Sequence, residues 1–184
     1  MIVDEQRKLA AIMFTDIVGY SALSQRDDRL ALELLEEHRE ILRKIFPKFN
    51  GTEIKTIGDG FLVEFNSALE AAQCAIEIQR TLAKRNPDTP AGRQIQVRIG
   101  IHIGDVLHRG GDVYGDGVNI ASRIEPLAGA GGICISMDVE RCHYTEHRPN
   151  FTKHRVRMSL QTPSLPAARA KRDRWFSEIQ RVIV

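Results

Sequence analysis

Two aspartates in the first third of the sequence are candidate ligands for a cation. Asp16 follows a short apolar run, Leu9 to Phe14, and Asp59 lies between two glycines in Gly58-Asp59-Gly60. If a sheet brings these positions together, the carboxylates repel unless a divalent cation such as Mg²⁺, which prefers oxygen ligands, neutralises them. Each aspartate also has a simpler explanation. Asp16 could cap a short helix over Ile17 to Ser21, and an aspartate such as Asp59 is common in glycine turns.

Other polar side chains have a spacing that suits substrate contacts. Lys55 lies four residues before Asp59 on a predicted strand. Asn119 and Arg123 are spaced i, i+4, which places them on one face of a helix. In isolation, a solvated strand lysine and an exposed polar helix face are the simpler explanations, so the chemistry depends on the elements that position these residues.

The hydrophobic pattern predicts alternating strands and helices. Apolar or alternating runs predict strands at 9–14, 52–57, 61–65, 97–103 and 133–135. Helical periodicity predicts helices over 30–49, 68–82 and from about 114 to 127. The order matches an α+β fold with a ferredoxin-like βαββαβ core and additions.

Three local features refine this prediction. Ser67, with Glu70 three residues later, forms a capping box at the start of the second helix. Val106-Leu107 either extends the strand at 97–103 or folds back from it. The third helix is expected to bury the residues at i, i+4 and i+7, which are Ile120, Ile124 and Leu127.

Composition limits the class of protein. The 184 residues are 42% hydrophobic and 27% charged, which is typical of one globular domain with a terminal extension. No run of 18 apolar residues is present, so no membrane span is expected. The charged start MIVDEQRKLAA lacks the apolar stretch of a signal peptide and predicts a cytoplasmic protein.

The charge is distributed unevenly along the chain. Residues 1–140 contain 16 basic and 21 acidic side chains, whereas residues 141–184 contain 10 basic and 3 acidic ones. This change predicts a core over 1–140 followed by a divergent basic segment over 141–184. The segment lacks interleaved aromatic residues and any nucleic-acid-binding motif, so no nucleic-acid partner is expected.

Four strings together resemble the catalytic domains of the class III nucleotidyl cyclases, the adenylyl and guanylyl cyclases. They are FTDIVGYS at 14–21, IKTIGDGFLVEF at 54–65, RIGIHIGDV at 98–106 and DVYGDGVNIASRIE at 112–125. The resemblance covers about residues 7–140 and follows the family's order. It implies a ferredoxin-like core and a head-to-tail homodimer with active sites shared between subunits.

The resemblance also implies a metal site. Asp16, Asp59 and the backbone carbonyl of Ile17 match the ligands of two Mg²⁺ or Mn²⁺ ions. Gly19 allows the following backbone to approach the phosphates of a nucleotide. The family's lysine for the terminal phosphates has no counterpart that can be assigned, because residues 141–184 do not align with the family pattern.

Four further positions match residues that contact the substrate in the family. Lys55 and Asp112 match the pair that reads adenine, Asn119 the residue that orients the ribose, and Arg123 the one that stabilises charge on the α-phosphate. Guanylyl cyclases usually carry Glu and a small residue at the first two positions, so the predicted substrate is ATP.

The implied activity is an adenylyl cyclase that converts ATP to 3′,5′-cyclic AMP and pyrophosphate. Two metal ions would assist attack of the ribose 3′-hydroxyl on the α-phosphate. The alternative is a catalytically silent, cyclase-like module that binds nucleotide or regulates a partner. Diguanylate cyclases are excluded because no GGDEF-type string is present.

Overall fold

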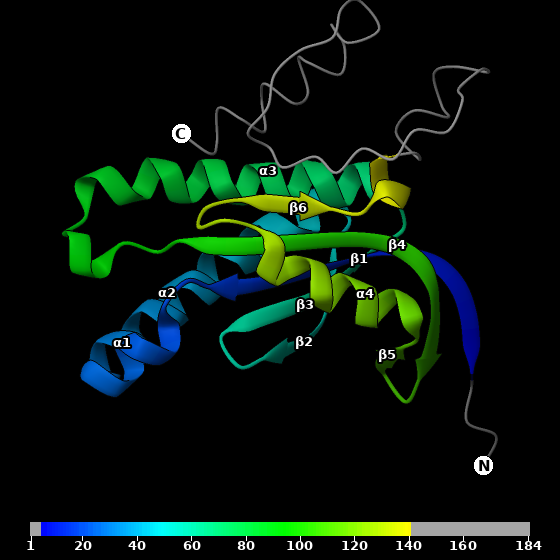
Figure 1. Ribbon diagram of the computed structural model, residues 1–184, viewed down its shortest axis with the longest axis horizontal. Coiled ribbons are helices and arrows are strands. Elements are labelled where there is room, and N and C mark those ends of the chain that lie inside the picture. Colours follow the sequence, from blue (N-terminus) through cyan, green and yellow to red (C-terminus); the bar gives the residue numbers. More distant parts are fainter. Residues whose placement is uncertain (1–4, 141–184) are drawn as a thin grey trace, which may run out of the picture.

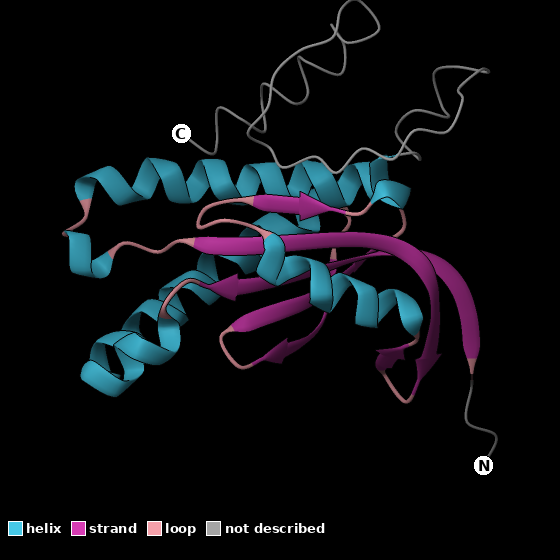
Figure 2. Ribbon diagram, in the orientation of Figure 1, coloured by secondary structure: helices cyan, strands magenta, loops and turns pink. Residues whose placement is uncertain are grey.

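The protein is built on one six-stranded sheet with helices on both faces (Figures 1 and 2), as seen in a computed structural model that describes residues 5–140. The strand order is β2-β3-β1-β4-β5, all antiparallel, and β6 pairs in parallel with β4. The strands are β1 (Gln6–Ile17), β2 (Thr52–Ile57), β3 (Gly60–Phe65), β4 (Val97–Arg109), β5 (Asp112–Tyr114) and β6 (Ile133–Ile135). The helices are α1 (Tyr20–Arg26), α2 (Asp28–Ile45), α3 (Ala68–Arg85) and α4 (Asp116–Ile124).

Strand β1 is the centre of the sheet. It pairs with β4 along its whole length, from Gln6 opposite His108 to Ile17 opposite Val97, and with β3 on its other side. The two long strands curl together, as Figure 2 shows. Val106-Leu107 therefore extends β4, which resolves the alternative left open by the sequence.

Two apolar clusters fix the helices to the sheet. On one face, α2 and α3 pack against alternate residues of the central strands, among them Met13, Val63, Ile99 and Ile101. On the other face, Ala121 of α4 packs in a smaller cluster with Ala10, Ile12, Leu62, Val106 and Val113. The βαββαβ succession and the α+β class are as predicted.

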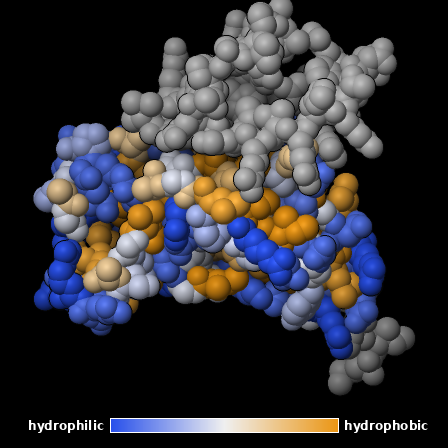
Figure 3. Space-filling model, viewed as in Figure 1, coloured by the Kyte–Doolittle hydropathy of each residue, from blue (hydrophilic) through white to orange (hydrophobic). Residues whose placement is uncertain are grey.

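Some large apolar side chains remain at the surface. On the face seen in Figure 3, hydrophobic patches interrupt the polar surface. Within residues 5–140, the large apolar residues that are exposed are Leu9, Val18, Leu32, Ile57, Tyr114 and Leu127.

The first long helix agrees with its prediction. After α2, the chain continues as a 3₁₀ turn over Phe46–Phe49, and Asn50 adopts a left-handed conformation with φ 55°. Asparagine tolerates this conformation well, and it ends the helix.

The third helix differs from its prediction at both ends. Tyr114 belongs to β5, and α4 begins at Asp116. Leu127 was predicted to be buried, but it is 75% exposed. The α-helix ends at Ile124 and is followed by the 3₁₀ turn Glu125–Leu127, where Pro126 lacks an N–H for helical hydrogen bonding.

The predicted capping box forms only in part. The Ser67 hydroxyl accepts a hydrogen bond from the Leu69 N–H at 3.2 Å, as a helix cap does. The Glu70 carboxylate instead accepts from the Asn50 side chain at 2.7 Å, because the end of α2 lies beside the start of α3. Tertiary packing has replaced half of a local motif.

Helix α1 was not predicted as an element of its own. Its N-cap is Gly19, with φ 76°, and no side chain caps it. Asp16 therefore does not cap a short helix; it lies within β1 and pairs with Arg98 across the sheet.

Two further sequence predictions concern the boundary at residue 140 and the absence of a membrane span. The division at residue 140 cannot be compared with the structure, since residues 141–184 lie outside the described residues. Among the helices of residues 5–140, none is both long and apolar enough to cross a membrane.

The buried His38 predicts a pH dependence of stability. Its side chain is fully buried on α2 against Phe61, with no hydrogen-bond partner at either ring nitrogen. Burial, with the nearby Arg39 charge, lowers its pKa from 6.5 to about 4. The unfolded chain therefore binds a proton at this histidine near pH 6.5, whereas the folded chain binds it only near pH 4. The free energy of unfolding consequently decreases as the pH falls from about 6.5 to about 4.

We expect this histidine to destabilise the fold by about 2 kcal/mol between pH 7.5 and pH 5. In His38→Leu that contribution should be absent, so the variant should lose correspondingly less stability over the same interval. Urea unfolding at the two pH values measures the difference. Equal losses in the two proteins would contradict the assignment.

Candidate functional site

The structure brings Asp16 and Asp59 together. Asp16 is next to last in β1, and Asp59 lies at the tip of the β2–β3 hairpin, which folds back onto the end of β1. The Ile17 N–H donates a hydrogen bond to Asp59 Oδ2 at 2.8 Å. The hairpin predicted from Gly58-Asp59-Gly60 thus fixes one carboxylate directly beside the other.

Close backbone packing holds this hairpin in place. A Cβ atom at Gly60 would lie 1.8 Å from the Thr15 carbonyl oxygen, so this approach requires glycine. The Phe61 N–H donates to the Thr15 hydroxyl at 3.0 Å, and Arg39 of α2 donates to the Gly58 carbonyl at 3.2 Å. The tip is therefore held from both sides.

The two carboxylates influence each other electrostatically. Burial raises the pKa of Asp59, the Ile17 N–H opposes this shift, and the neighbouring Asp16 charge raises the pKa further. A carboxylate whose ionised form is disfavoured in this way gains from a nearby cation. Both carboxylates are hard oxygen donors of the kind that Mg²⁺ and Mn²⁺ prefer, so their chemistry fits the ions predicted from the sequence.

Two more charged residues complete this carboxylate cluster, which we define as Asp16, Asp59, Arg98 and Glu125. Arg98 lies directly opposite Asp16 in the β1–β4 register and forms an ion pair with it. Its Nε lies 3.1 Å from Glu125 Oε1. Burial raises the pKa of Glu125, and the nearby Asp16 charge adds to the effect, whereas Arg98 opposes it.

Glycine also permits the approach of Glu125. A Cβ atom at Gly100 would lie 2.4 Å from the Glu125 backbone nitrogen. Gly100 is two residues from Arg98 on β4, so both face the same side of the sheet. The turn after α4 can therefore lie on the strand and direct Glu125 toward the guanidinium.

Lys55 and Asp112 form the second group of predicted residues. Lys55 Nζ lies 2.5 Å from Asp112 Oδ2, and it lies 6.0 Å from the centre of the Tyr114 ring. The lysine hydrogen bond lowers the pKa of Asp112. The other oxygen of Asp112 accepts from the Val113 N–H at 2.8 Å, which orients the carboxylate.

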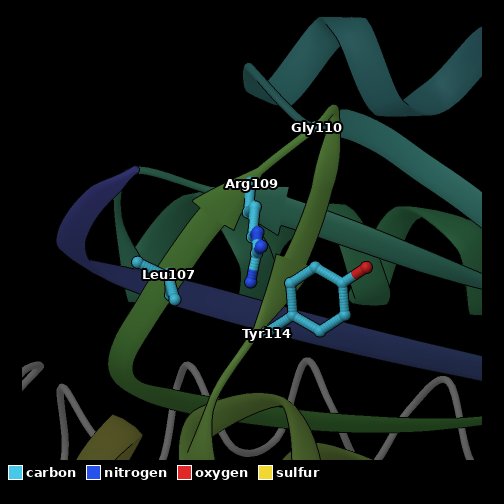
Figure 4. Close-up of a pocket in the computed structure, with 4 residues that line it drawn as sticks. All are labelled: Leu107, Arg109, Gly110 and Tyr114. Carbon is cyan, nitrogen blue, oxygen red and sulfur yellow. The ribbon is translucent and has the colours of Figure 1, made fainter. Parts of the chain in front are cut away.

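An open pocket lies next to this ion pair. It has a volume of about 590 Å³ and lies at the β4–β5 hairpin, where Arg109 and Tyr114 project side by side (Figure 4). Leu107 and Gly110 complete its lining. Tyr114 therefore borders both the pocket and Lys55.

Asn119 and Arg123 occupy the exposed side of α4. They lie one turn apart, while Ala121 between them is buried in the smaller cluster. The Asn119 N–H donates to the Gly115 carbonyl at 3.3 Å, and its carbonyl accepts from the Ser122 hydroxyl. Both side chains are available to a ligand, as the i, i+4 spacing predicts.

The predicted residues thus form three groups rather than one assembled site. Within the described residues, no hydrogen bond or ion pair joins Asp16 or Asp59 to Lys55, Asp112 or Arg123. In that same part of the chain, no group of three or more His, Cys, Asp or Glu side chains is arranged to hold a metal. A two-carboxylate site of this kind relies on phosphate oxygens and water for the remaining ligands.

Comparison with known proteins identifies the family. Residues 2–171 match the adenylate and guanylate cyclase catalytic domain. The chain belongs to this family. A protein named "Putative adenylate cyclase 3" from Rhizobium meliloti (strain 1021) is 44% identical over 132 residues, covering 71% of this chain and 22% of that protein.

Solved structures agree with this assignment. The crystal structure of an adenylate/guanylate cyclase/hydrolase from Silicibacter pomeroyi is 35% identical, with a TM-score of 0.72 over 87% of this chain and 94% of that one. The catalytic core of a rhodopsin-guanylyl cyclase with converted specificity, in complex with ATPalphaS, is 26% identical, with a TM-score of 0.68 over 76% and 83% of the two chains. The cyclase domain fold is therefore confirmed.

The curated relatives are longer than this cyclase domain. An adenylate cyclase of Streptomyces coelicolor is 32% identical over 126 residues, which are 68% of this chain and 32% of that protein. The chain thus spans about a fifth to a third of the length of these two relatives.

Sequence reasoning missed two members of the carboxylate cluster. Arg98 appeared only as the first residue of the string RIGIHIGDV, and Glu125 only as the last residue of the string DVYGDGVNIASRIE. Their roles depend on strand register, which sets Arg98 opposite Asp16, and on the close contact at Gly100. Charge complementarity between Asp16 and Arg98 was the only available signal in the sequence.

The proximity of the two aspartates gives a direct test. In Asp16→Asn, the pKa of Asp59 should fall toward its ordinary value, because the effect of the Asp16 charge is removed while burial remains. Carbon-13 NMR of labelled aspartate side chains in metal-free protein measures this pKa. The exposed Asp105→Asn is the matched control, and an unchanged Asp59 pKa in Asp16→Asn would contradict the geometry.

Proposed function

We propose that this cyclase domain converts ATP to 3′,5′-cyclic AMP and pyrophosphate. The observation that carries the choice of ATP is the Lys55–Asp112 pair, which offers a donor and an acceptor 2.5 Å apart beside an open pocket. Adenine presents an unprotonated N1 and an N6 amine, whereas guanine presents the opposite pattern at these two atoms. The named relatives from R. meliloti and S. coelicolor, both adenylate cyclases by name, support the same choice.

The carboxylate pair supports a role for two divalent ions. Asp16, Asp59 and the Ile17 carbonyl would hold Mg²⁺ or Mn²⁺, with Gly19 leaving the adjacent backbone open to phosphates. Such ions lower the pKa of an attacking hydroxyl and neutralise charge on the triphosphate. The chain contributes by fixing the Asp59 carboxylate with the Ile17 N–H and the hairpin backbone with the close contact at Gly60, so that this carboxylate is in place before a nucleotide binds.

The remaining residues would orient the substrate. Asn119 would hold the ribose so that its 3′-hydroxyl faces the α-phosphate, and Arg123, one turn along α4, would stabilise negative charge developing there. Lys55 and Asp112 would exchange their mutual ion pair for contacts with the adenine edge. The reaction transfers the 3′-oxygen to phosphorus and releases pyrophosphate without a covalent enzyme intermediate.

A head-to-tail homodimer would assemble these groups. Asp16 and Asp59 would come from one subunit, and Lys55, Asp112, Asn119 and Arg123 from the other. The lack of a direct contact between the two groups within the described protomer supports this arrangement. It predicts two sites per dimer and none in a monomer.

The nucleotide preference tests the base-reading pair. We expect wild-type protein with Mn²⁺ to favour ATP over GTP by about tenfold to a thousandfold in kcat/KM, because unpaired buried polar groups cost about 1–3 kcal/mol each. Lys55→Glu with Asp112→Cys should reduce that preference. Cyclic nucleotide formed from each substrate is measured by chromatography.

The outcomes separate the alternatives. Equal kcat/KM values for ATP and GTP would remove Lys55 and Asp112 from base recognition. Binding of ATP without product from either nucleotide would instead favour the catalytically silent module. The matched control is Lys48→Glu, which changes an exposed lysine on the 3₁₀ turn after α2 and should leave the nucleotide preference unchanged.

Complementation tests the metal ligands and the shared site together. Asp16→Asn and Arg123→Ala should each reduce activity at least about a hundredfold, since each removes a charge that acts on the reacting phosphate. Mixing the two variants should restore activity, because one site of the mixed dimer contains only intact groups. If mixed dimers form and remain inactive, the shared-site arrangement is wrong.

A further inference from the structure

Arg98 lies between two acidic side chains of the carboxylate cluster. Its guanidinium contacts Asp16 on one side, and its Nε lies 3.1 Å from Glu125 on the other. A guanidinium stays protonated in proteins, so Arg98 places a positive charge directly against Asp16. A divalent ion that binds Asp16 must therefore compete with a positive charge already present.

Glu125 gives that charge an alternative partner. Its side chain is 11% exposed, and it is held against β4 by the close contact at Gly100. The side chains of Arg98 and Asp16 are 32% and 28% exposed, so a guanidinium that lost its partner would be left partly buried and uncompensated, which is unfavourable. Because Glu125 contacts the same guanidinium, Arg98 can release Asp16 without becoming unpaired.

We propose that Arg98 is a resident cation that occupies Asp16 when no metal is bound, and that Glu125 retains Arg98 when a divalent ion takes Asp16. The two residues together then set the divalent-ion affinity of the site. Glu125 is a positioning residue, since it acts only through Arg98, whereas Arg98 contacts Asp16 directly. This inference rests on the proposed metal role of Asp16 and Asp59.

Arginine suits this exchange better than lysine would. The guanidinium is planar and carries five N–H donors, so one side chain can contact two carboxylates at once. Asp16 and Arg98 face each other across β1 and β4, which fixes the starting position, and the 3₁₀ turn after α4 fixes Glu125.

Manganese titration of the nucleotide-free, full-length chain tests the proposal, with free Mn²⁺ followed by electron paramagnetic resonance. Arg98→Gln should lower the dissociation constant roughly threefold to tenfold, because the competitor is gone. Glu125→Gln should raise it by a similar factor, because Arg98 then remains on Asp16. Arg29→Gln, which removes an exposed arginine on α2, should leave it unchanged.

The double variant distinguishes this exchange from a simple field effect. In the Arg98→Gln background, Glu125→Gln should change the dissociation constant by less than about twofold, because Glu125 has nothing left to retain. An undiminished effect there would make Glu125 a direct ligand or a bystander charge and would overturn the proposal. Equal affinities of wild type and Arg98→Gln would also overturn it.

A measurement on the wild-type protein avoids any loss of folding in the variants. Nitrogen-15 NMR of the arginine Nε–H groups should show the Arg98 signal shifting on titration with Mg²⁺ and saturating with the ion. A signal that does not move while Mg²⁺ binds would overturn the inference alone. If Asp16→Asn binds Mn²⁺ as well as wild type does, the proposed metal role fails, and the inference fails with it.

Discussion

The arrangement of this molecule depends on holding two carboxylates side by side at the end of its central strand. Asp16 and Asp59 repel each other, so the surrounding structure must supply the force that keeps them together. It does so with the β1–β3 pairing and the hydrogen bond from the Ile17 N–H to Asp59. The large apolar cluster beneath this end of the sheet, which includes Phe61 beside the hairpin tip, provides the stability that offsets the repulsion.

Two glycines allow the close backbone contacts that position the acidic side chains of the site. Gly60 allows the hairpin to lie on the Thr15 carbonyl, and Gly100 allows the turn after α4 to lie on β4. Each contact is too close for any residue with a Cβ atom. The positions of Asp59 and Glu125 are therefore set by backbone packing rather than by the flexibility of their own side chains.

Two pairs of charged side chains at the site are already formed in the ligand-free protein. Lys55 pairs with Asp112, and Asp16 pairs with Arg98, so substrate and metal would bind by exchanging partners rather than by entering an empty charged site. This exchange reduces the cost of keeping charges half-buried in the free protein. It also favours ligands that replace each lost contact with one of equal or greater strength, which is a source of selectivity.

The sequence by itself determined the local elements and the chemical types of the site residues. Periodicity located most strands and helices, the glycine turn marked the hairpin at Asp59, and the i, i+4 spacing placed Asn119 and Arg123 on one exposed helix face. These features depend on residues a few positions apart, which the sequence displays directly.

Only the tertiary structure decided how distant residues meet. The register of β1 with β4 set Arg98 against Asp16 across 82 positions. The end of α4 at Ile124 and the 3₁₀ turn that contains Pro126 brought Glu125 inward and left Leu127 at the surface. A shift of one residue in register would have sent Arg98 to the opposite face of the sheet. Such pairings are fixed by the packing of the whole core and not by any short segment, so the sequence indicated the two proposed metal ligands but not the arginine and glutamate beside them.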